Sequence, residues 1–189
     1  MMPDYHEQIY QPEEDTYLLL KYALKEARPD DSILEVGTGS GLIAKKMNDI
    51  SKNTVAIDIN PYACKSAKKS GVEVIRCDLM SCLNTKFDLI LFNPPYLPTN
   101  PEERINDWLE YALDGGLNGR VTIEKFVNLL ENVMSKDGRC LLLLSSLTGV
   151  EEVSKYLSLK GFLSYIIAEE KIEDEKLYVL RIIYDMCRL

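Results

Sequence analysis

The chain has 189 residues, of which 46% are hydrophobic, and its formal net charge is −8. This length supports one domain with a sizeable core and excludes two full domains. The acidic charge repels phosphate backbones, which weighs against a nucleic-acid enzyme that works alone. A group of lysines (Lys65, Lys68 and Lys69) or a basic partner could supply the attraction, although a solvated helix face is the simpler interpretation of these lysines.

The sequence predicts neither a membrane segment nor a metal site. The longest apolar runs, such as 140–144, are far shorter than the ~20 residues that span a bilayer, and no secretory leader is expected. The five cysteines lack a C-x-x-C pair and His6 is the single histidine, so neither a disulfide framework nor a structural zinc site is expected. We expect a soluble, cytoplasmic protein whose thiols mostly serve as small core side chains.

Helices and strands alternate along the first half of the chain. Acidic residues in the first turn and Lys25 near the end predict a helix over 13–28. Further helices are predicted over 42–50 and over 61–70, the latter bounded by Pro61 and Gly71. The predicted strands of this half are 32–36, 54–58, 72–75 and 87–92.

The second half begins with a long, irregular, charged stretch over 97–118, which contains Pro98, Pro101 and Trp108. Loops of this length are usually functional. The elements predicted after it are a helix (121–134), a turn at Asp137 and Gly138, a strand (140–145), a helix (148–159) and a hairpin of 162–168 with 177–184 around a charged turn (169–176). The alternation predicts an α/β fold with a mostly parallel, doubly wound sheet of seven strands, helices on both faces and an antiparallel edge hairpin.

A glycine run, Gly37 to Gly41, follows the first strand. Glycines there let the backbone approach a ligand and turn into a helix with free amide donors, which is typical of a nucleotide or nucleoside site. The third glycine comes one residue too early for G-x-G-x-x-G, and no Gly-Lys-Ser/Thr follows, so a dinucleotide is disfavoured and a P-loop is excluded.

The second predicted strand ends on an acidic residue, Asp58, and the third is followed by another, Asp78. Asp58 lies about twenty residues beyond Gly37, the usual spacing for an acid that accepts from both ribose hydroxyls. Asp78 is placed to accept from an adenine amino group, although both acids could simply be surface residues. An acidic ribose site without a phosphate-binding lysine suits a positively charged nucleoside, and S-adenosylmethionine is such a molecule.

Asn93-Pro94-Pro95-Tyr96 follows the apolar fourth strand. Each X-Pro step holds the preceding residue in an extended conformation, so this backbone is stiff and cannot continue as a helix. The stiffness suits a site for a small planar group, while the alternative is a plain exit from a strand.

Together these motifs resemble those of Rossmann-like class I S-adenosylmethionine-dependent methyltransferases, and the last one resembles the NPPY motif of the subgroup that methylates planar nitrogens. The segments 10–19 and 112–116 further resemble the HemK-like protein-glutamine methyltransferases, in their short archaeal and eukaryotic branch. That branch lacks the N-terminal release-factor-binding domain of bacterial HemK. We expect residues 1–189 to form a single methyltransferase domain, with residues 1–30 as a tail and helix that close over the cofactor.

The resemblance implies N5-methylation of the glutamine in the Gly-Gly-Gln motif of a class-1 translation release factor, with S-adenosyl-L-homocysteine as product. It also implies a small zinc-containing activator subunit, and the apolar strand 72–75 near a sheet edge fits such a partner. No metal is expected in the chain itself. The predicted cofactor site comprises Asp15, Thr16, Glu35, Gly37, Thr38, Gly39, Gly41, Asp58, Ile59, Asp78, Leu79 and Asn93. The predicted substrate site comprises Asn93, Pro94, Pro95 and Tyr96.

Asn93, Pro94 and Tyr96 are the predicted catalytic residues. If the Asn93 side-chain oxygen and the Pro94 carbonyl each accept one substrate N–H, the amide is held in a fixed plane and its nitrogen lone pair faces the methyl group. Tyr96 can stack on the amide. Asp15 and Thr16 would close over the methionine end of the cofactor, with helix capping as their alternative role. No histidine base is required, because a methylated amide nitrogen loses its proton to water.

Two other functions remain open from the sequence. An amino-methyltransferase acting on adenine or guanine in RNA or DNA would use the same Asn-Pro-Pro-Tyr motif on a flipped base. Acidity, small size and the lack of an appended nucleic-acid-binding domain favour a protein substrate. A non-catalytic cofactor-binding or scaffold protein is the third possibility, and the intact asparagine and prolines disfavour it.

Overall fold

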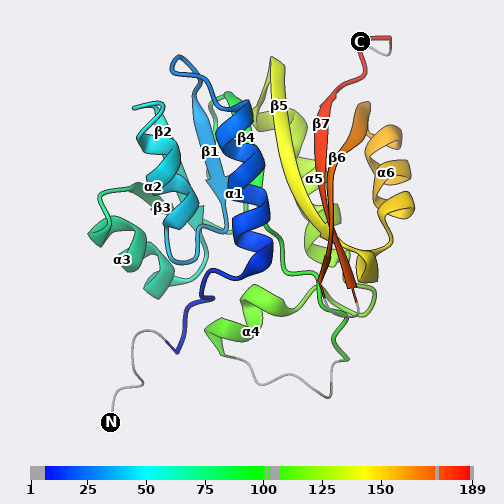
Figure 1. Ribbon diagram of the computed structural model, residues 1–189, viewed down its shortest axis with the longest axis horizontal. Helices are drawn as coiled ribbons and strands as arrows, with labels where there is room; N and C mark the ends of the chain where they lie inside the picture. Colours follow the sequence, from blue (N-terminus) through cyan, green and yellow to red (C-terminus); the bar gives the residue numbers. More distant parts are fainter. Residues whose placement is uncertain (1–6, 101, 103–106, 173–174, 188–189) are drawn as a thin grey trace.

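The computed structural model describes residues 7–100, 102, 107–172 and 175–187. Its centre is a seven-stranded sheet in the order β3-β2-β1-β4-β5-β7-β6 (Figure 1). The strands from β3 to β5 pair in parallel, and β7 is antiparallel to both β5 and β6, so six strands share one direction and β7 runs against them. The strands are β1 (Ile33–Val36), β2 (Thr54–Asp58), β3 (Glu73–Arg76), β4 (Phe87–Phe92), β5 (Met134–Ser145), β6 (Phe162–Ile172) and β7 (Glu175–Tyr184). The predicted fold class is confirmed.

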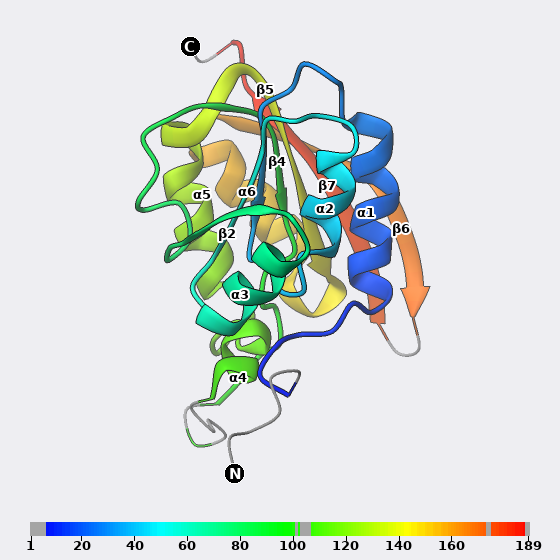
Figure 2. The same cartoon turned by 90° about the vertical axis from the view of Figure 1, so that its left-hand side faces the viewer.

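Helices cover both faces of the sheet (Figure 2). One face packs against α1 (Glu14–Glu26), α2 (Leu42–Asn48) and α3 (Pro61–Lys69), and the other against α5 (Val121–Val133) and α6 (Val150–Leu159). The sequence of β5 is continuously apolar because both of its faces are buried. Leu141 and Leu143 belong to the core under α1, while Leu142 and Leu144 belong to the core under α5. None of the helices in the described ranges is long and apolar enough to cross a membrane.

Three predicted segments differ from the structure by more than two residues. The stretch 97–118 contains a short helix, α4 (Trp108–Leu113), which begins where the Asp107 carboxylate accepts from the Glu110 backbone N–H at 2.8 Å. The predicted turn at Asp137 and Gly138 is wrong, because β5 extends back to Met134, and the pairing with β4 shifts between the Phe87 and Leu89 positions.

The edge hairpin is also longer than predicted. β6 and β7 continue pairing as far as Ile172 and Glu175, so most of the charged stretch 169–176 is strand. Charged side chains are common on edge strands because one face and one edge meet water. The structure does not describe residues 173–174, His6 or Pro101, so the expectations for those positions lie outside it.

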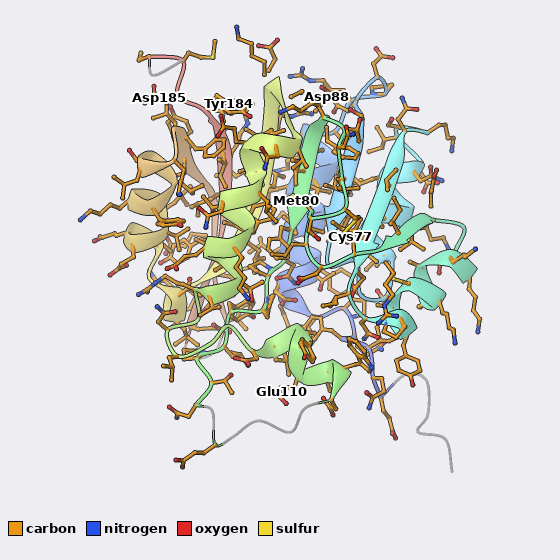
Figure 3. All side chains as sticks on the ribbon, turned by 180° about the vertical axis from the view of Figure 1, so that it is seen from behind. Cys77, Met80, Asp88, Glu110, Tyr184 and Asp185 are labelled. Atoms are coloured by element: carbon orange, nitrogen blue, oxygen red, sulfur yellow. A yellow bond between two sulfur atoms is a disulfide. The ribbon has the colours of Figure 1, made fainter. Side chains whose placement is uncertain are left out.

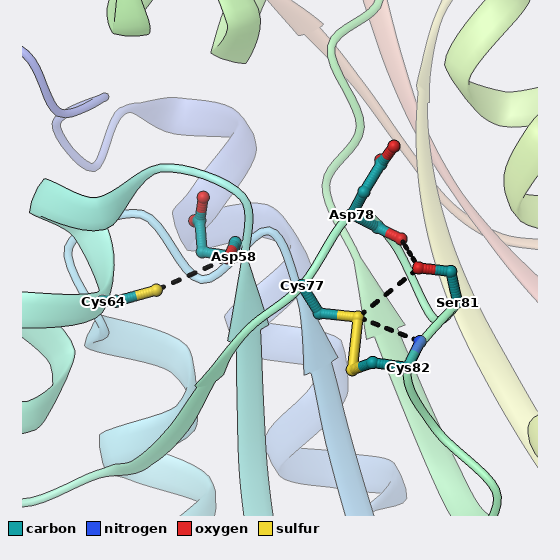
Figure 4. The surroundings of a disulfide bond; sticks show 6 residues. All are labelled: Asp58, Cys64, Cys77, Asp78, Ser81 and Cys82. Carbon is teal, nitrogen blue, oxygen red and sulfur yellow. Dashed lines mark hydrogen bonds between the residues drawn. A yellow bond between two sulfur atoms is a disulfide. The ribbon is translucent and has the colours of Figure 1, made fainter.

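Cys77 and Cys82 form a disulfide, which the cysteine pattern did not predict (Figure 4). The turn after β3 brings their Cα atoms to 6.1 Å, within the range that a disulfide spans. A spacing of five residues lies outside the usual C-x-x-C signature, so only the turn geometry reveals the pair. The other cysteines of the described chain are unpaired, and Cys140 is fully buried in the core, as expected for a small apolar side chain.

A buried arginine ties α1 to the sheet at the end away from the carboxyl ends of the parallel strands. Arg139 on β5 is 3% exposed, and its guanidinium donates to both Asp31 carboxylate oxygens at 3.2 and 2.6 Å and to the Asp88 carbonyl at 3.0 Å. It also bonds to the Glu26 carboxylate and carbonyl at the last turn of α1. This anchor holds the C-terminal end of α1, which sets the position of its N-terminal end beside Asn93.

Candidate active site

A cavity of about 920 Å³ opens at the carboxyl ends of β1, β2, β3 and β4. The strand order reverses between β1 and β4, and ligands of open α/β sheets bind outside the strand ends at such a point. The first turn of α1 and the short helix α4 also lie at this end of the sheet (Figure 1). Figure 3 shows Glu110 of α4 at this end and Asp88 near the opposite one. The volume suits a small-molecule ligand.

The glycine loop after β1 forms one wall of the cavity. Gly37 and Gly39 have φ angles of +65° and +53°, in the left-handed region that favours glycine. The Gly39 N–H donates to Asp58 Oδ2 at 2.9 Å, which ties the loop to the end of β2. Gly41 is not among the residues that line the cavity: it is the N-cap of α2, and a Cβ there would lie 2.8 Å from the Ala67 Cα atom. The close approach of α2 to α3 therefore explains this glycine.

Glu35 lies beneath the loop and is 4% exposed. Its Oε2 accepts from the Thr38 hydroxyl and from the Ala44 N–H at 2.9 Å, so the carboxyl joins the glycine loop to the start of α2. Burial raises the pKa of Glu35 to about 8, although both hydrogen bonds oppose this rise. Glu35 therefore supports the glycine loop from within the chain, and it also lines the cavity, so its contact with the cofactor stays a prediction.

Asp58 is buried at the end of β2, and burial raises its pKa against the opposing effect of its backbone hydrogen bonds. Each carboxylate oxygen accepts one backbone N–H, from Gly39 at 2.9 Å and from Asn60 at 2.8 Å. A carboxylate has about four acceptor positions, so acceptor capacity remains for a ribose hydroxyl. Asp78 is exposed on the same wall, and both acids extend to the same side of the sheet (Figure 4).

Leu79 adjoins Asp78 and lies between the disulfide cysteines. Its φ angle of +48° makes it the one non-glycine residue of the described chain with a positive φ. Such backbone strain persists where the surroundings hold it, and it is common at ligand sites. The Cys77–Cys82 disulfide closes the turn that carries Leu79.

The charge of the cavity fits S-adenosylmethionine. Among the described residues, eight acidic side chains line it, with a single basic one, Lys125. The raised pKa of Glu35 keeps that carboxyl protonated near neutral pH, so the charge rests on the other seven: Glu13, Asp15, Asp58, Asp78, Glu110, Asp114 and Glu175. A nucleoside with a sulfonium and an ammonium group is attracted to such a wall, whereas a nucleoside phosphate is repelled. In the described part of the chain, no three His, Cys, Asp or Glu side chains are grouped to hold a metal ion.

Asn93 and Pro94 also line the cavity, directly after β4, which is the sheet neighbour of β1. Asn93 Nδ2 donates to Asp15 Oδ2 at 3.0 Å, and Asn93 Oδ1 is buried without a hydrogen-bond partner in the described chain. Tyr96 is half-buried beside them, with its hydroxyl 3.5 Å from the same Asp15 oxygen. Burial, and secondarily the negative charge of Asp15, raises the pKa of Tyr96, so the hydroxyl stays protonated.

The structure brings all the predicted site residues except Gly41 to the wall of this one cavity. Sequence reasoning gave no role to Tyr10, which also lies on the wall and donates to Asp15 Oδ2 at 2.9 Å. The aromatic at position 10 was visible in the sequence, but a loop residue ahead of a helix has no periodicity that would indicate its contact.

The sequence also predicted no physical role for the segment Asp114-Gly115-Gly116. Leu97 pairs with the backbone here: its N–H donates to the Leu113 carbonyl at 3.0 Å, and its carbonyl accepts from the Gly115 N–H at 2.9 Å. A Cβ on Gly119 would lie 2.4 Å from the Tyr96 carbonyl oxygen. The backbone of Leu113 and Gly115 therefore braces the residue that follows Tyr96, and Gly119 lets the chain approach the Tyr96 carbonyl.

The fold and this cavity define a class I S-adenosylmethionine-dependent methyltransferase, and solved chains with this fold include methyltransferases in complex with S-adenosyl-L-homocysteine. Residues 12–106 match the family model of the methyltransferase small domain, and the chain belongs to that family. Within it, the chain groups with the HemK-like protein-glutamine methyltransferases.

The similarity to individual relatives extends over nearly the whole chain. A Methanocaldococcus jannaschii protein that bears the name of a protein N5-glutamine methyltransferase is 41% identical, covering 93% of this chain and 91% of its own. Methyltransferase HEMK2 of Homo sapiens is 31% identical, covering 92% and 88%. The solved E. cuniculi Mtq2-Trm112 complex, described as responsible for methylation of the eRF1 translation termination factor, matches with a TM-score of 0.79, 28% identity and coverage of 94% and 99%.

Proposed function

We propose that this enzyme methylates the side-chain nitrogen of a glutamine in a translation release factor in the cytoplasm, within the Gly-Gly-Gln motif of class-1 factors. One observation carries the proposal: the buried, unpartnered Asn93 Oδ1 adjoins Pro94 in the cavity that also contains the glycine loop and Asp58. A primary amide has two N–H groups, and these two carbonyl groups can accept them. The substrates named for the M. jannaschii and E. cuniculi relatives support the choice of glutamine and of a release factor.

Specific residues would hold the cofactor at this site. S-adenosylmethionine supplies an electrophilic methyl group on its sulfonium sulfur. In the proposal Asp58 accepts from the ribose hydroxyls, Asp78 and Leu79 contact the adenine, and Gly37 to Gly39 let the backbone approach closely. Within the predicted closing segment 1–30, of which residues 1–6 lie outside the described structure, Asp15 and Thr16 then close over the methionine end; both are buried on the cavity wall.

The substrate residues act by position and charge. Asn93 Oδ1 and the Pro94 carbonyl each accept one N–H of the glutamine amide, which fixes its plane and directs its nitrogen lone pair across the cavity. The same two oxygens stabilise the positive charge that develops on nitrogen, and they do so strongly because Pro94 is buried and excludes water. Tyr96 packs on the amide plane. The product nitrogen releases its proton to solvent, so no side-chain base is required.

The test is a methyl-transfer assay with labelled cofactor on a release factor and on total RNA in parallel, with products located by mass spectrometry. We expect label on the glutamine of Gly-Gly-Gln and none on the factor in which that glutamine is replaced by alanine. Equal labelling of the alanine variant would refute the glutamine assignment. Label on RNA alone would show that the acceptors of Asn93 and Pro94 serve a base amino group.

We further propose a small activator subunit as partner, zinc-containing as in the family that the sequence resembles. The Trm112 subunit of the E. cuniculi complex supports a partner of this kind. Strand β3 is a sheet edge, and its Ile75 is 40% exposed. An open edge offers unpaired backbone groups to an added strand. Size-exclusion chromatography together with a methyl-transfer assay tests the idea. Ile75→Lys should weaken the association with the partner. A monodisperse profile and full activity of the isolated chain would contradict the proposal.

A further inference from the structure

A buried carboxylate contacts the side chain of Asn93. Asp15 is 4% exposed, in the first turn of α1, and lies 78 residues away from Asn93 in the sequence. Its Oδ2 accepts from Asn93 Nδ2 at 3.0 Å and from the Tyr10 hydroxyl at 2.9 Å. Its Oδ1 accepts from the backbone N–H and the hydroxyl of Thr16. All these donors are neutral, so the carboxylate is held by hydrogen bonds and by the N-terminal end of the helix dipole.

The chemistry of this contact determines which way the Asn93 amide faces. An ionised carboxylate can only accept hydrogen bonds, so the amide must present its N–H₂ group to Asp15. Facing Oδ1 toward Asp15 would place two acceptors against each other in a buried site and leave both unsatisfied. The orientation therefore follows from the pair itself, and Oδ1 is left on the other side, buried and without a partner in the described chain.

The tyrosines beside Asp15 preserve this arrangement. Burial, followed by the negative charge of Asp15, raises the pKa of both Tyr10 and Tyr96, so both hydroxyls stay protonated. The Tyr10 hydroxyl donates to the same oxygen as Asn93 and does not compete for the Asn93 amide. Leaving a buried carbonyl oxygen without a hydrogen-bond donor costs about 1–3 kcal/mol of stability. A protein retains such an oxygen where a ligand supplies the missing donor.

We propose that Asp15 is a positioning residue for methyl transfer: it holds the Asn93 amide in the one orientation that presents Oδ1 to an N–H of the substrate amide. This inference rests on the proposed function and adds to it a residue that acts through Asn93. With the amide turned over, Nδ2 would face the substrate N–H, and the acceptor that orients the nitrogen would be lost.

The test compares Asp15→Asn with Glu14→Gln. An asparagine side chain in place of Asp15 has the same shape but can present either an oxygen or a nitrogen to Asn93, so it no longer selects one orientation. Glu14→Gln removes the same charge from the same helical turn, at an exposed position outside the cavity. We expect kcat at saturating cofactor and substrate to fall by roughly tenfold or more in Asp15→Asn and to change by less than about twofold in Glu14→Gln.

A double variant separates positioning from other roles. If Asp15 acts through Asn93, Asp15→Asn added to Asn93→Ala lowers kcat little beyond Asn93→Ala alone. Additive losses would overturn the proposal. So would a preserved kcat in Asp15→Asn combined with a large loss of S-adenosyl-L-homocysteine affinity in calorimetry, because Asp15 would then serve the cofactor alone.

A measurement on the unmodified enzyme is independent of activity and of variant folding. In the ¹⁵N-labelled wild type, the Asn93 side-chain proton that faces Asp15 should be protected from solvent exchange, and an unprotected amide would overturn the inference. A wild type that methylates no glutamine would refute the proposed function, while the Asn93 amide signal would still decide whether Asp15 holds that side chain.

Discussion

Arg139 offers a stringent test of how the site is supported. The substitution Arg139→Met keeps much of the apolar stem and removes the guanidinium, which is buried with Asp31 (6% exposed). In the unmodified chain, the Arg139 guanidinium lies 2.6 Å from the Asp31 carboxylate and 3.0 Å from the Asp88 carbonyl oxygen. The substitution leaves both acceptors without this charged donor. Breaking a buried ion pair from one side costs about 3–5 kcal/mol, because the remaining charge is desolvated without compensation.

The matched control is Arg181→Met on β7. Arg181 bonds to the same Glu26 carboxylate at 3.2 Å, but its side chain is 31% exposed and this ion pair does not involve Asp31. Partly exposed pairs contribute about 0–1 kcal/mol. Urea unfolding followed by circular dichroism measures both variants, with the midpoint and slope fitted together. A loss below about 1 kcal/mol in Arg139→Met, or equal losses in the two variants, would refute the account of Arg139 as an anchor.

Three further predictions concern the cavity. Asn93→Ala should lower methyl transfer by ~10² or more while calorimetry still detects cofactor binding, and near-normal turnover would reject the catalytic role of Asn93. Asp58→Ala should weaken cofactor binding by roughly tenfold or more, because it removes the charged acceptor for the ribose; unchanged affinity would mean that the ribose is held elsewhere. For Glu35, the folded-state pKa of about 8 lies above the ordinary value of 4.5, so the folded chain keeps a proton that the unfolded chain releases. Its contribution to stability is therefore full below pH 4.5 and declines as the pH rises toward 8. In Glu35→Gln this decline should be reduced in melting curves recorded between about pH 5 and 8, and an identical pH profile would show that Glu35 titrates normally.

The sequence by itself determined the architecture and the place of the site. Apolar strands that alternate with amphipathic helices require parallel neighbours with helical crossovers, and parallel strands bring their carboxyl ends to one edge. Gly37, Asp78 and Asn93 each follow such a strand and Asp58 ends one, so their meeting at one cavity followed from local pattern and topology together.

Only the tertiary structure decided which contacts support that site. Asp15 meets Asn93 because Arg139 and the core under α1 hold that helix against the sheet, and no periodicity encodes a contact between such distant positions. The sequence predicts Gly41 as part of a ligand-binding loop. In the structure, Gly41 instead packs against Ala67 on α3. The orientation of the Asn93 amide is likewise invisible in the sequence, because it depends on the carboxylate that packing places beside it.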